Sequence, residues 1–258
     1  MRRSKRAITV FVLAALAATG ARACPLVRGE PAAAPVRIER GAVRLVDGTR
    51  LVPPGAIVPT HLNPSERLAE AAEEAARQLL EGRTLRLASA PADRHGRMTA
   101  SATLSDAQPV DLAVALVEAG AAYADPARRP SCTDALLSAE RRARAERRGL
   151  WSTPDAILAA RDGAAARART GLFVVAEGRV YSARRAGDTF YVNFAGPRGE
   201  TLVASTAAKS SDGLDPAMLT GTLMRVRGVV NGGASPMLAF EPRGAEFSAT
   251  GRRKESAW

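Results

Sequence analysis

The hydrophobic and polar positions of the chain divide it into two patterned stretches separated by an alanine-rich segment. In the first stretch, short alternating apolar segments predict β-strands, and Asp47-Gly48 is typical of a hairpin turn between two of them. These strands are expected at residues 36–38, 43–46, 51–57, 84–88 and 98–104.

The same stretch also contains segments with the apolar period of a helix. For the first of these, Asn63 is a candidate N-cap, Pro64 suits the start and Gly82 suits the end. The two later segments are each followed by a glycine, at positions 120 and 149. We expect helices over residues 66–80, 110–118 and 133–148, which gives the order three strands, helix, two strands, two helices.

The second stretch is almost entirely strand-like. A polar, alanine-rich segment at 153–170 precedes it and is interpreted as a linker. Strands are expected at residues 173–180, 189–194, 201–204, 223–230 and 237–241, with a short helix at 215–220. Five strands with one helix are the inventory of an OB-like β-barrel, here expected over 171–247. The fold class is therefore mainly β with α (α+β).

Both ends of the chain differ from its centre. Residues 1–23 combine four early basic residues, an apolar run and the small-residue site Ala21-Arg22-Ala23, a pattern that predicts a secretory signal peptide. Residues 24–35 form a proline- and alanine-rich linker, and the charged tail 248–258 is expected to be disordered. No other stretch approaches the roughly 20 apolar residues of a transmembrane helix. We expect an exported protein, periplasmic or secreted.

Charge changes this picture only moderately. The formal net charge is +11, and removal of the signal with its five basic residues would lower it to +6. A basic surface suits nucleic acid, another polyanion or an anionic membrane, and it also supports solubility.

The two cysteines, Cys24 and Cys132, lie 108 positions apart. An oxidising compartment would allow them to form a disulfide, worth about 4 to 5 kcal/mol by loop entropy. Two alternatives remain open: lipid attachment at Cys24, against which Ala21-Arg22 is a poor cleavage site, and two unpaired thiols.

Several short motifs together carry a family resemblance. The segment Asp93-Arg94-His95-Gly96-Arg97 is followed by Ala100, the sequence 116–122 reads LVEAGAA, and Ala139-Glu140, Ala143-Arg144 and Gly149-Leu150-Trp151 follow in order. In this combination, residues 36–152 resemble a staphylococcal nuclease-like (thermonuclease) domain. The resemblance implies a five-stranded OB-fold barrel with three helices. The sequences 191–194 and 226–228 resemble, more weakly, an accessory barrel that follows such domains.

The resemblance implies calcium-dependent phosphodiester cleavage, with aspartates holding the cation, a glutamate acting on water and two arginines binding phosphate. The sequence departs from that pattern. Gly41 and Ile57 stand at the metal aspartate positions, Thr60 at the catalytic glutamate and Val52 at the first arginine. A shifted register would place Arg50 there, but no Asp or Glu occurs between Gly48 and Ser65. We therefore expect no bound calcium and no other cofactor.

One family position is retained, namely Arg97. Its guanidinium is a candidate phosphate ligand, and the alternative is a structural role in a turn. His61 and His95 lie beside the former glutamate site and within the arginine motif, so a metal-free acid–base pair is a speculative alternative. No Cys/His cluster has zinc spacing.

Two further groups are candidates for nucleic-acid contact. On the segment 140–148, helical spacing aligns Arg141, Arg144 and Arg148 along one side, which is either a nucleic-acid stripe or an ordinary solvated face. In the second barrel, Tyr181, Phe190, Tyr191 and Phe194 are candidate stacking groups, about half of which should point into the core.

These observations favour an exported, non-catalytic protein whose barrels bind a polyanion such as nucleic acid or an envelope protein partner. An active secreted nuclease that uses other residues is the alternative, and a purely structural assembly role is a third. The sequence leaves the oligomeric state open.

Overall fold

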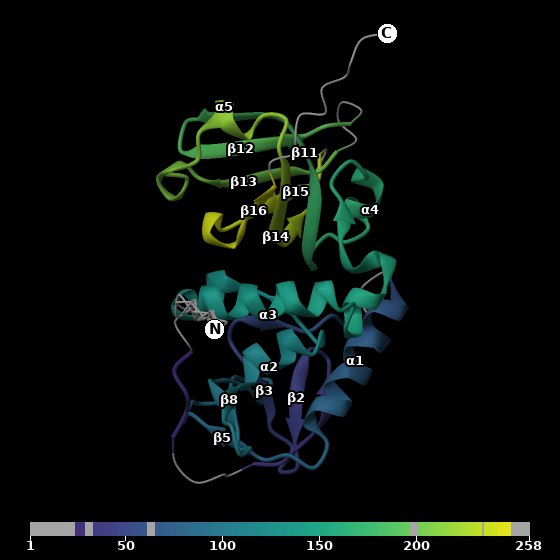
Figure 1. Ribbon diagram of the computed structural model, residues 1–258, viewed down its shortest axis with the longest axis vertical. Helices are drawn as coiled ribbons and strands as arrows, with labels where there is room; N and C mark the ends of the chain where they lie inside the picture. Colours follow the sequence, from purple (N-terminus) through teal and green to yellow (C-terminus); the bar gives the residue numbers. More distant parts are fainter. Residues whose placement is uncertain (1–23, 29–32, 61–64, 197–200, 234, 249–258) are drawn as a thin grey trace, which may run out of the picture.

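The computed structural model describes residues 24–28, 33–60, 65–196, 201–233 and 235–248. They form two lobes stacked along the long axis of the molecule, which we call the first lobe (24–152) and the second lobe (158–248) (Figure 1). The predicted signal peptide lies outside the described residues, as does the predicted tail beyond Ser248. Within the described part of the chain, no helix is long and apolar enough to cross a membrane.

The first lobe wraps short strands around one apolar core. One sheet has the order β1-β2-β3-β6, with β3 and β6 parallel, and a second has the order β5-β7-β8. Because Ala33 pairs with Leu85 of β5, the pairings run around the lobe back to the start of β1. The strands are β1 (Pro35–Glu39), β2 (Ala42–Leu45), β3 (Arg50–Val52), β4 (Ala56–Ile57), β5 (Leu85–Leu87), β6 (Arg97–Thr99), β7 (Ala102–Leu104), β8 (Val110–Asp111) and β9 (Tyr123–Ala124).

Two strands expected from the pattern are interrupted. The segment 51–57 divides into β3 and β4 because Pro53 and Pro54 cannot continue the ladder and Gly55 adopts a φ of 92°. The segment 98–104 divides into β6 and β7 because the first half pairs with β3 and the second half pairs with β5. The turn at Asp47-Gly48 is confirmed, with the N–H of Gly48 donating to the carbonyl of Leu45 at 3.0 Å.

The helices of the first lobe are α1 (Glu66–Leu80), α2 (Leu112–Glu118) and α3 (Thr133–Ala145). Helix α1 has the predicted bounds, although Asn63 and Pro64 lie outside the described residues. The helix predicted at 110–118 begins later because Val110–Asp111 pairs with β7, and the Asp111 carboxylate then caps α2 by accepting from the backbone of Ala113 at 3.0 Å. Helix α3 ends earlier than predicted because Arg147 adopts a φ of 53°.

The second lobe is a ring of paired strands. The order is β10-β11-β12-β13-β15-β14-β16, and β14 also pairs with β11, which closes the ring. Strands β13 and β15 are parallel. The elements are β10 (Leu158–Ala159), α4 (Gly163–Arg167), β11 (Phe173–Ala186), β12 (Thr189–Phe194), β13 (Val203–Ala207), α5 (Pro216–Leu219), β14 (Leu223–Asn231), β15 (Met237–Ala239) and β16 (Glu246–Ser248).

The segment expected to be a linker, 153–170, contains regular structure. It holds β10, which pairs with β11, and helix α4, which the Asp162 carboxylate caps. Leu158, Ala160 and Ala166 are buried in the core of the second lobe. This segment is therefore part of the packed structure.

An apolar cluster joins the two lobes across their junction. Leu68 of α1, Tyr123 of β9 and Trp151 pack in one cluster with Val175 of β11. The rings of Tyr123 and Trp151 meet edge to face, with 5.4 Å between their centroids. Helix α3 runs along this junction (Figure 1), and the apolar cluster joins the two lobes beside it.

A buried ion pair lies within the same junction. Strand alternation directs Arg225, Arg227 and Val229 of β14 to one side. Nη1 of Arg227 contacts both carboxylate oxygens of Glu140 of α3 at 2.8 Å, and both side chains are almost fully buried. The guanidinium also donates to the carbonyl of Gly244 at 2.8 Å. The motif containing Glu140 and the motif containing Arg227 therefore meet in space.

A second carboxylate at the junction, that of Glu246 on β16, binds three arginines. Arg144 contacts it through both Nη atoms at 2.8 and 3.0 Å, Arg225 contacts it at 3.0 Å and Arg227 at 3.5 Å. Burial of this carboxyl opposes ionisation, but the hydrogen bond and charge of Arg144 and the hydrogen bond of Arg225 hold its pKa at about 2.

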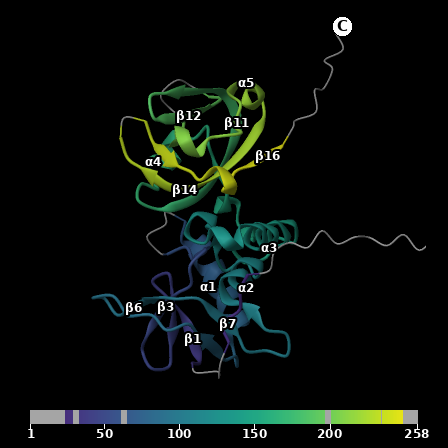
Figure 2. The ribbon, with the colours of Figure 1, turned by 90° about the vertical axis from the view of Figure 1, so that its left-hand side faces the viewer.

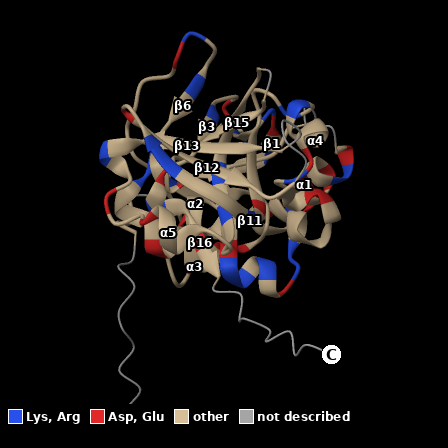
Figure 3. Cartoon of the chain, turned by 90° about the horizontal axis from the view of Figure 1, so that it is seen from above, with Lys and Arg blue, Asp and Glu red and all other residues tan. Residues whose placement is uncertain are grey.

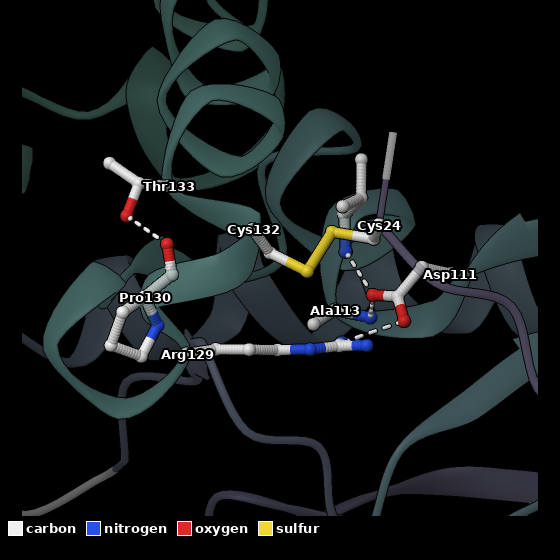
Figure 4. Close-up of a disulfide and its surroundings, with 8 residues drawn as sticks. Cys24, Asp111, Ala113, Arg129, Pro130, Cys132 and Thr133 are labelled. Atoms are coloured by element: carbon white, nitrogen blue, oxygen red, sulfur yellow. Dashed lines mark hydrogen bonds and ion pairs between the residues drawn. A yellow bond between two sulfur atoms is a disulfide. The ribbon is translucent and has the colours of Figure 1, made fainter. Parts of the chain in front are cut away.

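The expected disulfide between Cys24 and Cys132 is confirmed, with 5.1 Å between the Cα atoms. Figure 4 shows it at the start of α3, above the buried ion pair between Arg129 and Asp111, whose N–O distance is 2.7 Å. The bond fixes the first described residue to the core of the first lobe.

Candidate functional site

A cleft of about 650 Å³ opens between the two lobes. The first lobe contributes residues 57–60, which begin at the last residue of β4, together with Arg97, Asp125 and Arg128. The second lobe contributes Phe173 of β11, Val229 of β14 and Glu241. The cleft thus combines an apolar floor with charged groups of both signs.

Two of the three positions that the resemblance assigns to carboxylates line this cleft, and the third, Gly41, lies beside one of them. Ile57 and Thr60 line it, and a Cβ atom on Gly41 would lie 3.2 Å from Cγ2 of Thr60. Gly41 has a φ of 77° and Arg40 a φ of 50°, the combination of a tight turn between β1 and β2. An aspartate at position 41 would be strained there. Gly41 and the segment 57–60 are thus brought together, and none of the three family positions carries a carboxylate.

Arg97 lines the cleft and also closes the turn before β6. Its Nε donates to Asp93 at 2.9 Å, and its backbone N–H donates to the same carboxylate at 2.9 Å. The pKa of Asp93 is lowered to about 2, chiefly by that backbone hydrogen bond. The turn projects from the molecule and carries adjacent acidic and basic segments (Figures 2 and 3). Arg97 therefore has the structural role considered from the sequence, while its half-exposed side chain leaves phosphate binding a prediction.

Of the other candidate residues, Arg50 lies next to Arg97 and Val52 does not pair with it. Arg50, the alternative arginine position, stands opposite Arg97 in the parallel ladder and donates to the carbonyl of His95. Val52 lies at the far end of the same strand. His95 is exposed, and its Nε2 lies 3.0 Å from Nε of Arg94. His61 lies outside the described residues, so the histidine pair is untested.

Two carboxylates of the cleft were not anticipated. Asp125 is almost fully buried, and burial raises the pKa of its carboxyl while Arg128, at 3.3 Å, opposes that rise. Glu241 comes from the other lobe. The spacing of residues along the sequence cannot predict this combination, because Asp125 and Glu241 come to one cleft only when the two lobes pack together.

The arginines of the proposed stripe on α3 have different surroundings. Arg144 is bound to Glu246 and stacks over Trp151, with 5.8 Å from its Cζ to the ring centroid. Arg148 contacts Glu146 at 2.8 Å, and Arg141 is more than half exposed. The stripe is therefore not one free surface.

The candidate stacking groups of the second lobe divide as strand alternation requires. Phe190 and Phe194 are buried in its core, while Tyr181 is 71 % exposed. Tyr191 lies on the outer face, where the guanidinium of Arg184 stacks on it with 5.5 Å from Cζ to the ring centroid.

Comparison with known proteins identifies part of the first lobe. Residues 52–153 match the family described as Staphylococcal nuclease homologue, so they form a domain of that kind. Among curated proteins, none matches the chain. The expected resemblance is thus confirmed for this segment.

Proposed function

We propose that this chain is an exported, catalytically inactive relative of staphylococcal nuclease that binds a polyanion such as nucleic acid, or an envelope protein partner. The observation that carries the proposal is the wall of the cleft, which Ile57, Thr60 and Arg97 line and behind which Gly41 packs against Thr60. An arginine that can bind a phosphate is present, and the acids that would activate water are missing from their family positions.

The donor set of this wall does not fit calcium. The cation takes about six to eight oxygen ligands in proteins, many of them from carboxylates. Gly41 and Ile57 offer no side-chain oxygen, and Thr60 offers one hydroxyl. Over the described parts of the chain, no group of three or more His, Cys, Asp or Glu is placed to hold a metal ion. Calcium-assisted hydrolysis is therefore not part of the proposed function.

Phosphate contact at the rim of the cleft is favoured by several exposed arginines. Arg97 and Arg128 line the cleft, while Arg50 and Arg94 flank the turn that precedes β6. Arg97 and Arg128 come from separate segments and line one cleft, and Arg50 is the ladder partner of Arg97. A backbone with repeated negative charge is the kind of ligand that such a rim attracts.

We propose further that residues 36–152 form a nuclease-like OB barrel and 171–247 a second OB-like barrel, to which the preceding segment contributes β10 and α4. Support comes from the pairings, which are alike in the two lobes. Strands β1, β2 and β3 pair in order and β3 runs parallel to β6, while β11, β12 and β13 pair in order and β13 runs parallel to β15. The packing of β10 and α4 extends the second module towards Leu158.

Export to the periplasm or the medium belongs to the same proposal. Its support is the signal-like sequence at 1–23 together with the disulfide of Cys24, the residue that follows it.

A plasmid-digestion assay with the mature protein, in calcium and in chelator, tests the proposal. We expect no cleavage in either condition. Binding to single-stranded DNA, measured at two salt concentrations, should weaken steeply with salt, and an Arg97→Ala variant should bind less tightly. Calcium-dependent cleavage would overturn the inactive assignment, while salt-independent or absent DNA binding would favour a protein partner or a purely structural role.

A second candidate function, nuclease activity by other residues, is favoured by Asp125 and Glu241. Both carboxylates line the cleft together with Arg97, and the raised pKa of Asp125 suits an acid or base. If the mature protein cleaves DNA, Asp125→Asn should abolish cleavage. A His95→Ala variant serves as the comparison, because His95 tests the histidine hypothesis separately.

A further inference from the structure

A second cavity, of about 480 Å³, lies at the other end of the junction between the lobes. Helix α3 and the turn after it contribute Arg141, Arg144 and Arg147, and β14 contributes Arg225. Trp151 and Ile157 supply an apolar wall. Four guanidinium groups from two lobes therefore border one hollow, which we call the arginine pocket.

The arginine pocket carries more positive charge than its neighbours neutralise. Glu246 pairs with Arg144 and Arg225, and Glu177 pairs with Arg225. Arg141 approaches Glu246 only to 3.9 Å. Arg147 makes no ion pair with any described residue. About two guanidinium charges are thus left without a close carboxylate at the cavity.

Two nitrogen donors of the same wall also lack partners. Nε1 of Trp151 and Nε of Arg225 are buried and make no hydrogen bond within the described chain. Trp151 is 7 % exposed. Buried N–H groups are nearly always paired in folded proteins, so an unpaired one beside a cavity calls for an acceptor from outside the described chain, such as an ordered water or a ligand oxygen.

We propose that the arginine pocket binds a phosphomonoester group, carried either by a small organic molecule or by the end of a nucleic acid chain. A phosphomonoester bears a charge of roughly −1.5 to −2 and three acceptor oxygens, which matches the two uncompensated charges and the unpaired donors. Planar guanidinium groups suit its oxygens through paired hydrogen bonds. The ring of Trp151 and the side chain of Ile157 provide contact for the organic part.

This site is distinct from the cleft. Arg225 and Val229 face the same way on β14, four residues apart, which corresponds to about 13 Å along a strand. The buried Arg227 and Glu140 lie between them. The inference therefore does not depend on the function proposed for the cleft.

Calorimetric titration of the mature full-length protein tests the proposal. The probes are phenyl phosphate, inorganic phosphate, and a trinucleotide with and without a 5′-phosphate, with phenol as the uncharged control. The pocket variant is Arg141→Gln/Arg147→Gln. The matched control is Arg161→Gln/Arg167→Gln, which removes the same charge from exposed positions around α4.

We expect saturable binding of phenyl phosphate and none of phenol. Affinity should fall at least tenfold in the pocket variant and less than twofold in the control. Trp151→Phe, which keeps an aromatic ring but removes the N–H, should weaken binding several-fold. Preference for the 5′-phosphorylated trinucleotide over phenyl phosphate would assign the group to a nucleic acid end, and the reverse would assign it to a small molecule. Absence of phosphate binding, or equal weakening in both double variants, would overturn the proposal.

Discussion

Replacing Arg227 with methionine removes one partner of the buried pair that joins the lobes. Glu140 would stay buried with one hydrogen bond, from the backbone N–H of Ala124 at 2.8 Å, and with Arg144 at 3.9 Å. The carbonyl of Gly244 would lose its side-chain donor as well. Breaking a buried pair from one side typically costs about 3 to 5 kcal/mol. Against a total stability of about 5 to 15 kcal/mol, that loss is large.

Urea unfolding, followed by circular dichroism, measures this cost. A double-mutant cycle with Glu140→Gln should return a favourable coupling of about 2 kcal/mol or more, because the two side chains act as one unit. Arg141→Met is the matched control, since that arginine is more than half exposed and should cost under about 0.5 kcal/mol. The interpretation of Arg227 as the link between the lobes is refuted if Arg227→Met costs less than about 1 kcal/mol.

Three other perturbations have expected outcomes. Cys24→Ser/Cys132→Ser should lower the free energy of unfolding by up to about 4 to 5 kcal/mol. A reductant should lower the Tm of the parent protein but not that of the variant. A parent protein whose Tm does not respond to the reductant would contradict a stabilising role of the disulfide. The folded-state pKa of Glu246, about 2, lies below its ordinary value of 4.5, so its contribution to the free energy of unfolding is present above about pH 4.5 and is lost as the pH falls towards 2. Glu246→Gln should flatten this part of the plot of stability against pH. An unchanged plot would count against this role of Glu246. Gly120→Ala would place a Cβ atom 2.1 Å from the carbonyl oxygen of Arg148 and should prevent normal folding. Gly82→Ala, at a glycine with a similar φ but open space around it, should lower the stability measured by thermal unfolding by about 1 kcal/mol. Equal costs for the two variants would show that the contact with Arg148 is unimportant.

Local patterns in the sequence were sufficient for much of the fold. The apolar period gave the bounds of α1, and the turn at Asp47-Gly48 lies where the pattern placed it. The cysteine pair and the nuclease-like motifs were also identified, since neither needs more than residue type and order. Where the pattern failed, as at the split between β6 and β7, the chain changes pairing partner, and a partner strand is not encoded in local alternation.

The sequence alone therefore determined which chemical groups the chain possesses, including the absence of Asp and Glu between Gly48 and Ser65 and the retention of Arg97. Only the tertiary structure decided which groups meet. Docking of the lobes buries Glu140 against Arg227 and brings Asp125 and Glu241 to one cleft. The physical reason is that strand and helix periods fix the direction of a side chain within its own element, whereas the partner across an interface depends on how whole elements pack.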